Sequence, residues 1–405
     1  MNSAQSSRQA IWVSYAAFIG LGLQAGMLGL AWTSIQKEFG QPLEAVGVLL
    51  FASTAGYLTS SFVSGALAHR IGNARLYIGG AVLFALGVAG FGLAPSWPLV
   101  ALAAVIGGLG SGAIDGGLNA YSAAHFNARS VNWMHACFGI GVTFAPLMLT
   151  AILTTMSWRV GYLLVAAYEI VVLILFIWSR RVWGWPPEHA PEPGTAHRRG
   201  ALDALRSPLV WLSILIFVLY AGVEVTPGQW TYSLFTDARG ISPTAAGFWV
   251  SFYWASFTLG RLIFGYFGNR WPVKTVLRGT MFGLIFGALL YWLDPFNGIG
   301  GIIGLGIMGF SQAPMFPFLV LNTPLVMGSA RASHSIGFQV AGAGLGVAII
   351  PSLAGLLAAQ VGIAVIAPFV FVVALILFGF YELLNMVASA TRRTSAVQPA
   401  DAASS

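Results

Sequence analysis

The chain has 405 residues, of which 57% are hydrophobic and only 8% are charged, and its mean hydropathy is +0.80. Soluble domains carry about 25% charged residues, so this composition excludes an ordinary soluble domain and indicates a membrane protein. The net charge of +7 is not a nucleic-acid signal, because the cations lie between apolar runs, where they report membrane topology. We therefore expect the lipid bilayer, and no nucleic acid, as a partner.

Twelve apolar runs are long enough to cross a bilayer, which takes about 20 helical residues. The runs are continuous rather than alternating, so they predict helices and not strands. The first run is too long for a secretory signal peptide and lacks a small-residue cleavage site. The expected spans are 11–35, 45–68, 76–94, 99–122, 134–155, 159–179, 209–235, 245–268, 274–293, 299–322, 333–358 and 363–388.

One connection is much longer than the others. Residues 180–208 are polar and Pro-rich, and they divide the spans six and six. We expect an N-terminal bundle at 1–182, a cytoplasmic linker at 183–207 and a C-terminal bundle at 208–405. The predicted fold class is thus an all-α membrane protein with twelve transmembrane helices in two six-helix bundles.

The distribution of Lys and Arg predicts the orientation. With both termini in the cytoplasm, 15 of the 19 basic residues lie inside, three lie outside (Lys37, Arg159 and Arg239), and Arg261 lies within a helix. This asymmetry predicts a multi-pass protein of the inner (plasma) membrane with both termini cytoplasmic. The residues counted as cytoplasmic are Arg8, Arg70, Arg75, Arg129, Arg180, Arg181, Arg198, Arg199, Arg206, Arg270, Lys274, Arg278, Arg331, Arg392 and Arg393.

The fourth span carries an acid inside a glycine-rich helix. Gly108, Gly112 and Gly116 repeat every fourth residue, which predicts a bare face that a second helix can approach closely. Asp115 and Asn119 share another face, one helical turn apart. An acid at that depth costs roughly 3 kcal/mol on insertion, so it usually faces a protein interior or an aqueous cavity.

The two halves of the sequence contain similar motifs at corresponding positions. The segment Gly65–Arg75, between spans 2 and 3, has a counterpart in Gly265–Lys274, between spans 8 and 9, at an offset of 200 residues. Pro146 in span 5 and Pro351 in span 11 lie at nearly the same offset. A parallel repeat of this kind predicts a substrate site near the midplane, between the halves.

These motifs resemble the major facilitator superfamily over the whole chain. The segment Gly65–Arg75 is similar to that family's Gly-x-x-x-Asp-Arg-x-Gly-x-Arg-Arg loop, with His69 where Asp is usual. Asp115 with Asn119, and the spacing from Asn132 to His135, resemble the fucose permease branch of sugar–proton symporters. That branch has an acid in span 1, which is absent here. The resemblance implies solute transport by alternating access.

Four charged residues lie deep in the predicted helices: Asp115, Glu169, Glu224 and Arg261. A carboxylate shielded from water takes up a proton more readily, so Asp115 and Glu224 are the predicted proton-coupling residues. The alternative for such an acid is a fixed ion pair that holds helices together, and we favour it for Glu169. We expect Arg261 to pair with an acid or to close the cytoplasmic gate.

Span 7 contains Pro227 and Gly228, which predict a broken helix of the kind that lines transporter binding sites. Aromatic rings near such a break could stack on the apolar faces of sugars, although membrane helices also use aromatic side chains for packing. The predicted substrate-binding residues are Gln24, Asn119, Gln229, Trp230 and Tyr253.

The predicted gating residues are Arg70, Arg261, Arg270 and His135. His135 could relay protons, because histidine titrates near neutral pH. The alternative is that it anchors a loop by hydrogen bonds from the start of its helix.

Catalytic signatures are missing from the sequence. There is no Gly-x-x-x-x-Gly-Lys-Ser/Thr loop, so ATP is not the expected energy source, and there is no Gly-x-Ser-x-Gly or His-Glu-x-x-His motif. The single cysteine, Cys137, excludes an intrachain disulfide and a Cys-based metal cluster, and we expect it to be a small packed residue. We therefore predict that the protein is not an enzyme and has no cofactor or metal.

We predict a secondary active transporter that takes up a sugar or polyol together with H⁺ and functions as a monomer. One alternative is proton-antiport efflux of drugs or metabolites, although Gly141–Pro146 keeps only part of the span-5 pattern of such proteins. The alternative outside transport is a membrane sensor, which would normally add a sizeable signalling domain.

Overall fold

The computed structural model describes residues 3–184, 205–267, 270–295 and 298–401, which form helices and no strand. The N-terminal half contains α1 (Ser3–Ala25), α2 (Leu28–Phe39), η1 (Leu43–Ala45), α3 (Val46–Ile71), α4 (Asn73–Leu93), α5 (Trp97–His125), α6 (Ala128–Leu153) and α7 (Trp158–Trp178). The C-terminal half contains α9 (Pro208–Ser233), η2 (Leu234–Ala238), α10 (Pro243–Phe267), α11 (Val273–Leu293), α12 (Ile299–Gln312), α13 (Met315–Met327), α14 (Ser329–Val361), η4 (Ile363–Val365) and α15 (Ile366–Asp401).

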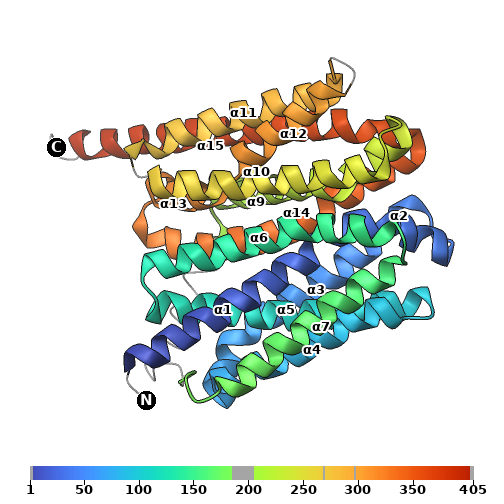
Figure 1. The fold of residues 1–405 in the computed structure, drawn as a ribbon. Coiled ribbons are helices and arrows are strands. Elements are labelled where there is room, and N and C mark those ends of the chain that lie inside the picture. Colours follow the sequence, from blue (N-terminus) through green and yellow to red (C-terminus); the bar gives the residue numbers. More distant parts are fainter. Residues whose placement is uncertain (1–2, 185–204, 268–269, 296–297, 402–405) are drawn as a thin grey trace.

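The long helices run along a common axis, with the N-terminal half below and the C-terminal half above in Figure 1. Among the described residues, ten helical segments are long and apolar enough to cross a membrane, and the bent pair of α1 and α2 makes up to eleven. Helix α10, with 25 residues, occupies the remaining predicted position. The all-α fold with six spans in each half is therefore as predicted.

Two spans are broken, but not the span for which the sequence predicts a break. Helix α9 continues through Pro227, and the Tyr253 hydroxyl of α10 donates to the carbonyl of Glu224, three residues before the proline, over 2.5 Å. Hydroxyls and neighbouring helices can satisfy backbone groups that a proline frees, so a membrane helix tolerates proline. The first span instead bends by 45° between Ala25 and Leu28, and the tenth is interrupted at Pro314.

Short polar segments end the helices. Asn127 caps α6 by accepting a hydrogen bond from the Ser130 amide over 2.9 Å, and Ser157 accepts one from the Arg159 amide at the start of α7. Gly40 terminates α2 with a left-handed φ of 60°, which glycine adopts without steric cost. These caps fix the turns that bring consecutive spans into contact.

The predicted linker begins inside the packed N-terminal half. Trp183 is buried; its indole donates to the Ser179 hydroxyl over 2.8 Å and contacts the ring of Tyr77. The Asn73 side chain donates to the Gly184 carbonyl over 2.7 Å. The packed unit thus extends through Gly184, and the remaining linker positions from 185 to 204 lie outside the described residues.

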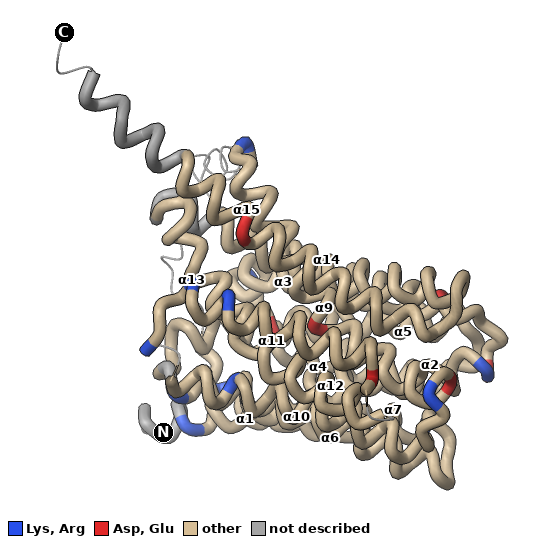
Figure 2. Tube along the Cα trace, turned by 90° about the horizontal axis from the view of Figure 1, so that it is seen from above, with Lys and Arg blue, Asp and Glu red and all other residues tan. Residues whose placement is uncertain are grey.

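Charged residues concentrate at the two ends of the molecule, with few between them (Figure 2). Both termini lie at one end, which we call the terminal end, and the opposite end is called the distal end (Figure 1). At the distal end the arginines are paired: Arg159 with Glu38 at 2.6 Å, and Arg239 with Asp294 at 3.2 Å. Two of the three basic residues predicted to lie outside therefore have their charge neutralised by a neighbouring acid.

Candidate functional site

Among the described residues, the two halves meet along three pairs of α-helices, and the short helix η1 also contacts α14. Helices α6 and α10 pack side by side, where Thr143 approaches Thr258 within 3.4 Å and Gly139 lies against the same Thr258 side chain. Helix α3 packs against α14, with Leu58 filling the space beside Gly344. The third pair, α2 and α9, lies toward the distal end.

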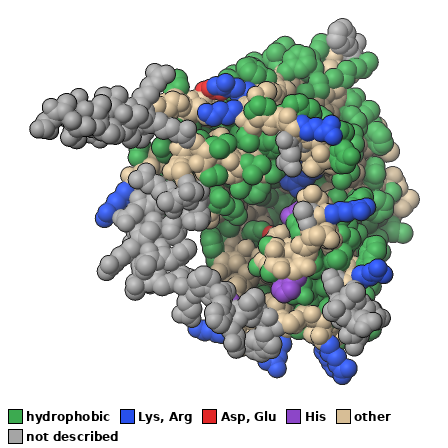
Figure 3. Space-filling view, turned by 90° about the vertical axis from the view of Figure 1, so that its left-hand side faces the viewer, with side chains coloured by type: hydrophobic (Ala, Val, Ile, Leu, Met, Phe, Trp, Pro, Cys, Tyr) green, Lys and Arg blue, Asp and Glu red, His purple; other side chains and the backbone are tan. Residues whose placement is uncertain are grey.

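The distal end of this interface is closed by direct backbone approach. Gly29 of α2 lies so close to Gly228 and Gln229 of α9 that a Cβ at position 29 would collide with their backbone. Gly47 of α3 lies against Ser352 of α14. The terminal end differs: the surface there is hollowed near its middle, and a histidine and an acidic side chain are visible in the hollow (Figure 3). The structure is therefore closed at the distal end and hollowed at the terminal end.

Asp115 on α5 has both carboxylate oxygens hydrogen-bonded within the N-terminal half. The Tyr57 hydroxyl of α3 donates to Oδ2 over 2.5 Å, and the Asn119 amide donates to Oδ1 over 3.0 Å. The side chains of Asp115 and Asn119 are only partly buried. They form a polar platform that can offer hydrogen-bond acceptors and donors to a solute.

The glycine face of α5 explains why Tyr57 reaches Asp115. A Cβ at Gly108 would meet the backbone of Ser53, and one at Gly112 would meet the backbone carbonyl of Tyr57. The predicted close approach of a second helix is therefore confirmed, and that helix is α3. At this separation the Tyr57 ring extends along α5 to the carboxylate.

Glu224 lies near the middle of α9 and is bonded within the C-terminal half. The Tyr220 hydroxyl, one turn earlier, donates to its carboxylate. Tyr253 of α10 donates to the Glu224 backbone carbonyl over 2.5 Å and approaches Gln312 Oε1 at 3.2 Å. Gln312 is fully buried and its Nε2 has no hydrogen-bond partner among the described residues. Tyrosine hydroxyls thus hold both the backbone and the side chain of Glu224.

Arg261 connects Glu224 to the other half of the molecule. Its guanidinium lies 4.4 Å from the centroid of the Phe257 ring and interacts electrostatically with both Glu224 and His135. His135 belongs to α6, so the charge of Arg261 acts across the interface of the two halves. The ion pair predicted for Arg261 is not found among the described residues, where no carboxylate oxygen lies within 4.0 Å of its guanidinium.

The alternative role of His135 as a loop anchor rests on a wrong helix boundary. Helix α6 begins at Ala128 rather than near residue 134, so His135 lies two turns inside the helix. Its ring packs edge-on against Phe18 of α1, with centroids 5.4 Å apart. The side chain is therefore part of the helix packing near Arg261 and not part of a loop.

Trp230 is not placed where a solute could stack on it in this conformation. The ring is fully buried, its indole N–H donates to the Pro351 carbonyl over 2.9 Å, and it packs against Gly355 of α14. Tyr253 is also fully buried, and Gln229 is 5% exposed beside the closed distal contact. The aromatic surface predicted for sugar stacking thus serves helix packing here.

The remaining predicted site residues lie apart from these clusters. Arg70 and Arg270 are exposed at the terminal end, and Arg270 stacks over Phe267 at 5.1 Å. Gln24 is partly buried on α1 next to the bend, and no side-chain hydrogen bond of Gln24 is found among the described residues. The structure therefore brings together Glu224 and Tyr253, and separately Asp115 and Asn119.

Glu169 differs from its predicted role. It is fully buried on α7 against Gly20 of α1, and neither carboxylate oxygen has a hydrogen-bond partner among the residues that the structure describes. The ion pair predicted for this acid is therefore not found. Gly20 leaves space for the carboxyl group between the two helices.

Three residues at these sites were not identified from the sequence: Tyr57, Tyr220 and Gln312. Tyr220 precedes Glu224 by one helical turn, the same spacing that identifies Asp115 with Asn119, so that signal was available. Tyr57 is 58 residues from Asp115, and Gln312 is 59 residues from Tyr253. Only the packing of helices reveals such partners.

The family model for the Major Facilitator Superfamily matches residues 15–240. The chain belongs to this superfamily. The glucose/mannose transporter GlcP of Bacillus subtilis (strain 168) is 22% identical to this chain over 353 residues, which cover 84% of this chain and 86% of GlcP. Sodium-dependent glucose transporter 1 of Homo sapiens is 23% identical over 383 residues, covering 84% of this chain and 72% of the relative.

Solved structures share the fold. A mutant of the nucleoside transporter NupG matches with a TM-score of 0.76 at 13% sequence identity, covering 92% of this chain and 100% of that structure. The superfamily and fold predicted from the sequence are therefore confirmed. This superfamily member is a multi-pass membrane protein and a secondary transporter of small solutes.

Proposed function

We propose that this superfamily member takes up a sugar or polyol together with a proton, by alternating access of a site between its two halves. The similarity to two glucose transporters supports a sugar-like solute. The distal closure and the hollowed terminal face correspond to a conformation open toward one compartment only. That arrangement is what alternating access around a central site requires.

We propose that the protein lies in the plasma membrane and that its terminal end faces the cytoplasm. Exposed cations such as Arg70 and Arg129 lie at that end, whereas Arg159 and Arg239 at the distal end are paired with acids. Lysine and arginine in short loops favour the cytoplasmic side. In a Cys137→Ser background, an impermeant maleimide should label Met156→Cys in intact cells and Arg75→Cys only after permeabilisation. The reverse labelling pattern would overturn this orientation.

The polar platform of Asp115 and Asn119 is the proposed contact for solute hydroxyls. A carboxylate and an amide side by side offer the acceptor and donor pair that a sugar diol requires. Both side chains are partly exposed, and their fixed hydrogen bonds hold them in place before a solute arrives. Positions held in this way cost less conformational entropy when the solute binds.

Proton coupling is the second part of the proposal, and we assign it to Glu224. An acid couples to transport only if its surroundings change when the halves move. The partners of Asp115 all lie in its own half and move with it. Glu224 shares Arg261 with His135, which belongs to the opposite half. Rocking of the halves moves His135 relative to Arg261, and this changes the electrostatic surroundings of Glu224.

The observation that carries this assignment is that the charge of Arg261, on α10, acts both on Glu224 of its own half and on His135 of the opposite half. Its test uses purified protein in proteoliposomes with a panel of labelled sugars and polyols. An imposed pH gradient should drive accumulation without sodium, and a protonophore should abolish it. If accumulation required a sodium gradient and did not depend on the pH gradient, the coupling ion would be Na⁺ and not H⁺. No counterflow of any sugar or polyol would refute the solute class.

A further inference from the structure

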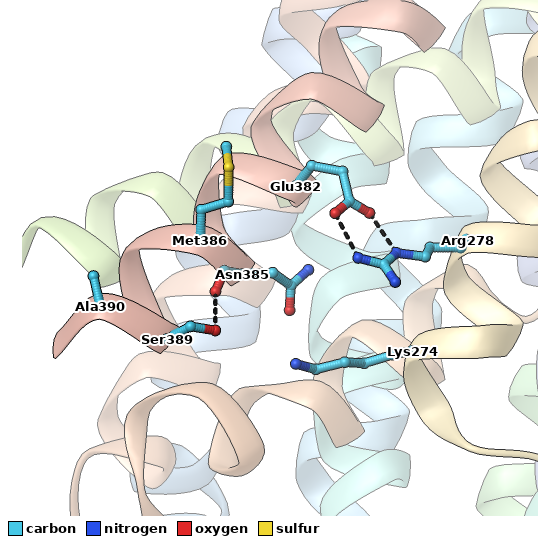
Figure 4. Close-up of a pocket in the computed structure, with 7 residues that line it drawn as sticks. All are labelled: Lys274, Arg278, Glu382, Asn385, Met386, Ser389 and Ala390. Carbon is cyan, nitrogen blue, oxygen red and sulfur yellow. Dashed lines mark hydrogen bonds and ion pairs between the residues drawn. The ribbon is translucent and has the colours of Figure 1, made fainter. Parts of the chain in front are cut away.

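An open pocket of ≈ 380 Å³ lies away from the interface of the two halves, between the terminal ends of α11 and α15 (Figure 4). Helices α11 and α15 lie at the outer edge of the C-terminal half in Figure 1. The pocket lining consists of Lys274, Arg278, Glu382, Asn385, Met386, Ser389 and Ala390. The solute pathway proposed above does not use any of these side chains.

The pocket carries an excess of positive charge. Arg278 forms a two-pronged pair with Glu382, in which Nε and Nη2 donate to the two carboxylate oxygens over 2.7 Å each. No hydrogen bond of the guanidinium Nη1 is found among the described residues, so this nitrogen can donate to a ligand. Lys274 extends into the pocket below Asn385, and no hydrogen bond or ion pair within 4.0 Å of its ammonium is found among the described residues. The pocket thus contains two cations and one acid, and its net positive charge favours the binding of an anion.

Asn385 adds a side-chain acceptor whose oxygen has no hydrogen-bond partner in the described part of the chain. The side chain is 6% exposed, lines the pocket and donates through Nδ2 to the Tyr381 carbonyl over 2.9 Å. That donation identifies the other amide atom as oxygen, and Oδ1 has no hydrogen-bond partner among the described residues. A buried acceptor without a donor is costly, so a ligand hydroxyl at this position would be stabilising.

An apolar surface continues from the pocket toward the middle of the helices. Phe282, one turn beyond Arg278, is 57% exposed and contacts Phe378 with ring centroids 4.9 Å apart. Met386 at the pocket itself is 62% exposed. Lys274 and Arg278 lie in the first two turns of α11, within about 8 Å of its end, which is the depth of lipid head groups. The pocket thus lies at the depth of lipid head groups, and an apolar surface suited to acyl chains continues from it.

We propose that this pocket binds an anionic phospholipid whose head group carries a free hydroxyl, as phosphatidylglycerol does. Lys274 and the free Nη1 of Arg278 would contact the phosphodiester, and Asn385 Oδ1 would accept from the head-group hydroxyl. The acyl chains would follow Phe282 down the outer surface of α11 and α15. Basic pockets between helix ends are a recognised way to hold lipid head groups.

Native mass spectrometry of the purified full-length chain tests the charge part of this proposal. Phosphatidylglycerol and phosphatidylcholine with identical acyl chains are titrated separately. We expect tighter binding of phosphatidylglycerol, and Lys274→Gln should weaken that binding about fivefold. The matched control is Arg75→Gln, an exposed cation at the terminal end of the other half, which should change nothing. Equal weakening by both variants, or by neither, would overturn the site.

Asn385→Leu tests the hydroxyl part separately. Phosphatidylethanol has the same single charge as phosphatidylglycerol and no head-group hydroxyl, so wild type should prefer phosphatidylglycerol about fivefold. The variant should lose that preference and keep its affinity for phosphatidylethanol. A variant that retains the preference would refute the contact with Asn385. Displacement of phosphatidylglycerol by millimolar glycerol 3-phosphate would instead assign the pocket to a free phosphate ester and refute a lipid ligand.

Discussion

Each half of this transporter contains a partly buried acid that accepts a hydrogen bond from a tyrosine, and the two acids differ in their other neighbours. Asp115 has its second oxygen bonded to Asn119 on the same helix, so its partners come from α3 and α5 alone. Glu224 is bonded to Tyr220 and lies near Arg261, which also faces His135 of the opposite half.

This difference separates two tasks that either acid could serve. A group whose partners all belong to one rigid half keeps those hydrogen bonds when the halves rock. A group that senses the opposite half changes its surroundings in the same motion. We therefore assign solute binding to Asp115 and proton coupling to Glu224, although the sequence alone predicts proton coupling for both acids.

The largest expected effect is that of Glu224→Gln on accumulation. The amide keeps the size of the side chain but cannot release a proton. With one proton moved per solute, a gradient of one pH unit supports roughly tenfold accumulation, and the variant should show none. Counterflow of solute for solute should persist, because exchange needs no net proton movement. Loss of counterflow as well would show that Glu224 is needed for solute binding. That result would contradict the assignment of solute binding to Asp115 and proton coupling to Glu224.

Gly112→Ala should destabilise the protein by about 1–3 kcal/mol, because its Cβ would collide with the backbone of α3 beside Tyr57. Thermal unfolding in detergent measures the effect. The matched control is Gly79→Ala on α4, where a Cβ meets nothing within 4 Å. That variant should be unchanged or slightly stabilised, because alanine favours helices. Equal Tm values for both variants would contradict the close approach of α3 and α5.

Asp115→Asn should raise the KM for the solute about fivefold and leave pH-driven accumulation in place. The substitution removes the charge but keeps an oxygen that can accept from Tyr57. Initial uptake rates over a range of solute concentrations give the KM. Tyr57→Phe, which removes only the donor to Asp115, should have a smaller effect. If Asp115→Asn abolished accumulation at saturating solute, the coupling proton would belong to the N-terminal half.

The smallest expected functional effect is that of Trp230→Phe. The phenyl ring fills most of the indole's space between α9 and α14 but cannot donate to the Pro351 carbonyl. We expect an unchanged KM and a loss of stability of about 1 kcal/mol, which appears as a lower Tm. A KM raised severalfold at unchanged Tm would indicate that Trp230 contacts the solute.

The spans and the glycine face of α5 were predictable, because the spacing of apolar and small residues along one helix determines them. The partner that approaches this face, and the Tyr57 hydroxyl that it brings to Asp115, depend on contacts between distant segments. Pro227 shows a second limit. A proline predicts a break, but the helix continues, and the breaks occur at residues 26–27 and at Pro314. Tertiary packing decides which proline or glycine interrupts a membrane helix.

The most direct test of the account measures proton movement itself. Proteoliposomes that contain a trapped pH indicator are given solute without any imposed gradient, and proton entry is recorded for wild type, Asp115→Asn and Glu224→Gln. Solute binding to each purified variant, measured in parallel, confirms that the protein is intact. We expect solute to drive proton entry in wild type and in Asp115→Asn at saturating solute, and to drive none in Glu224→Gln. Proton entry that persists in Glu224→Gln and disappears in Asp115→Asn would contradict the assignment of the coupling proton to Glu224.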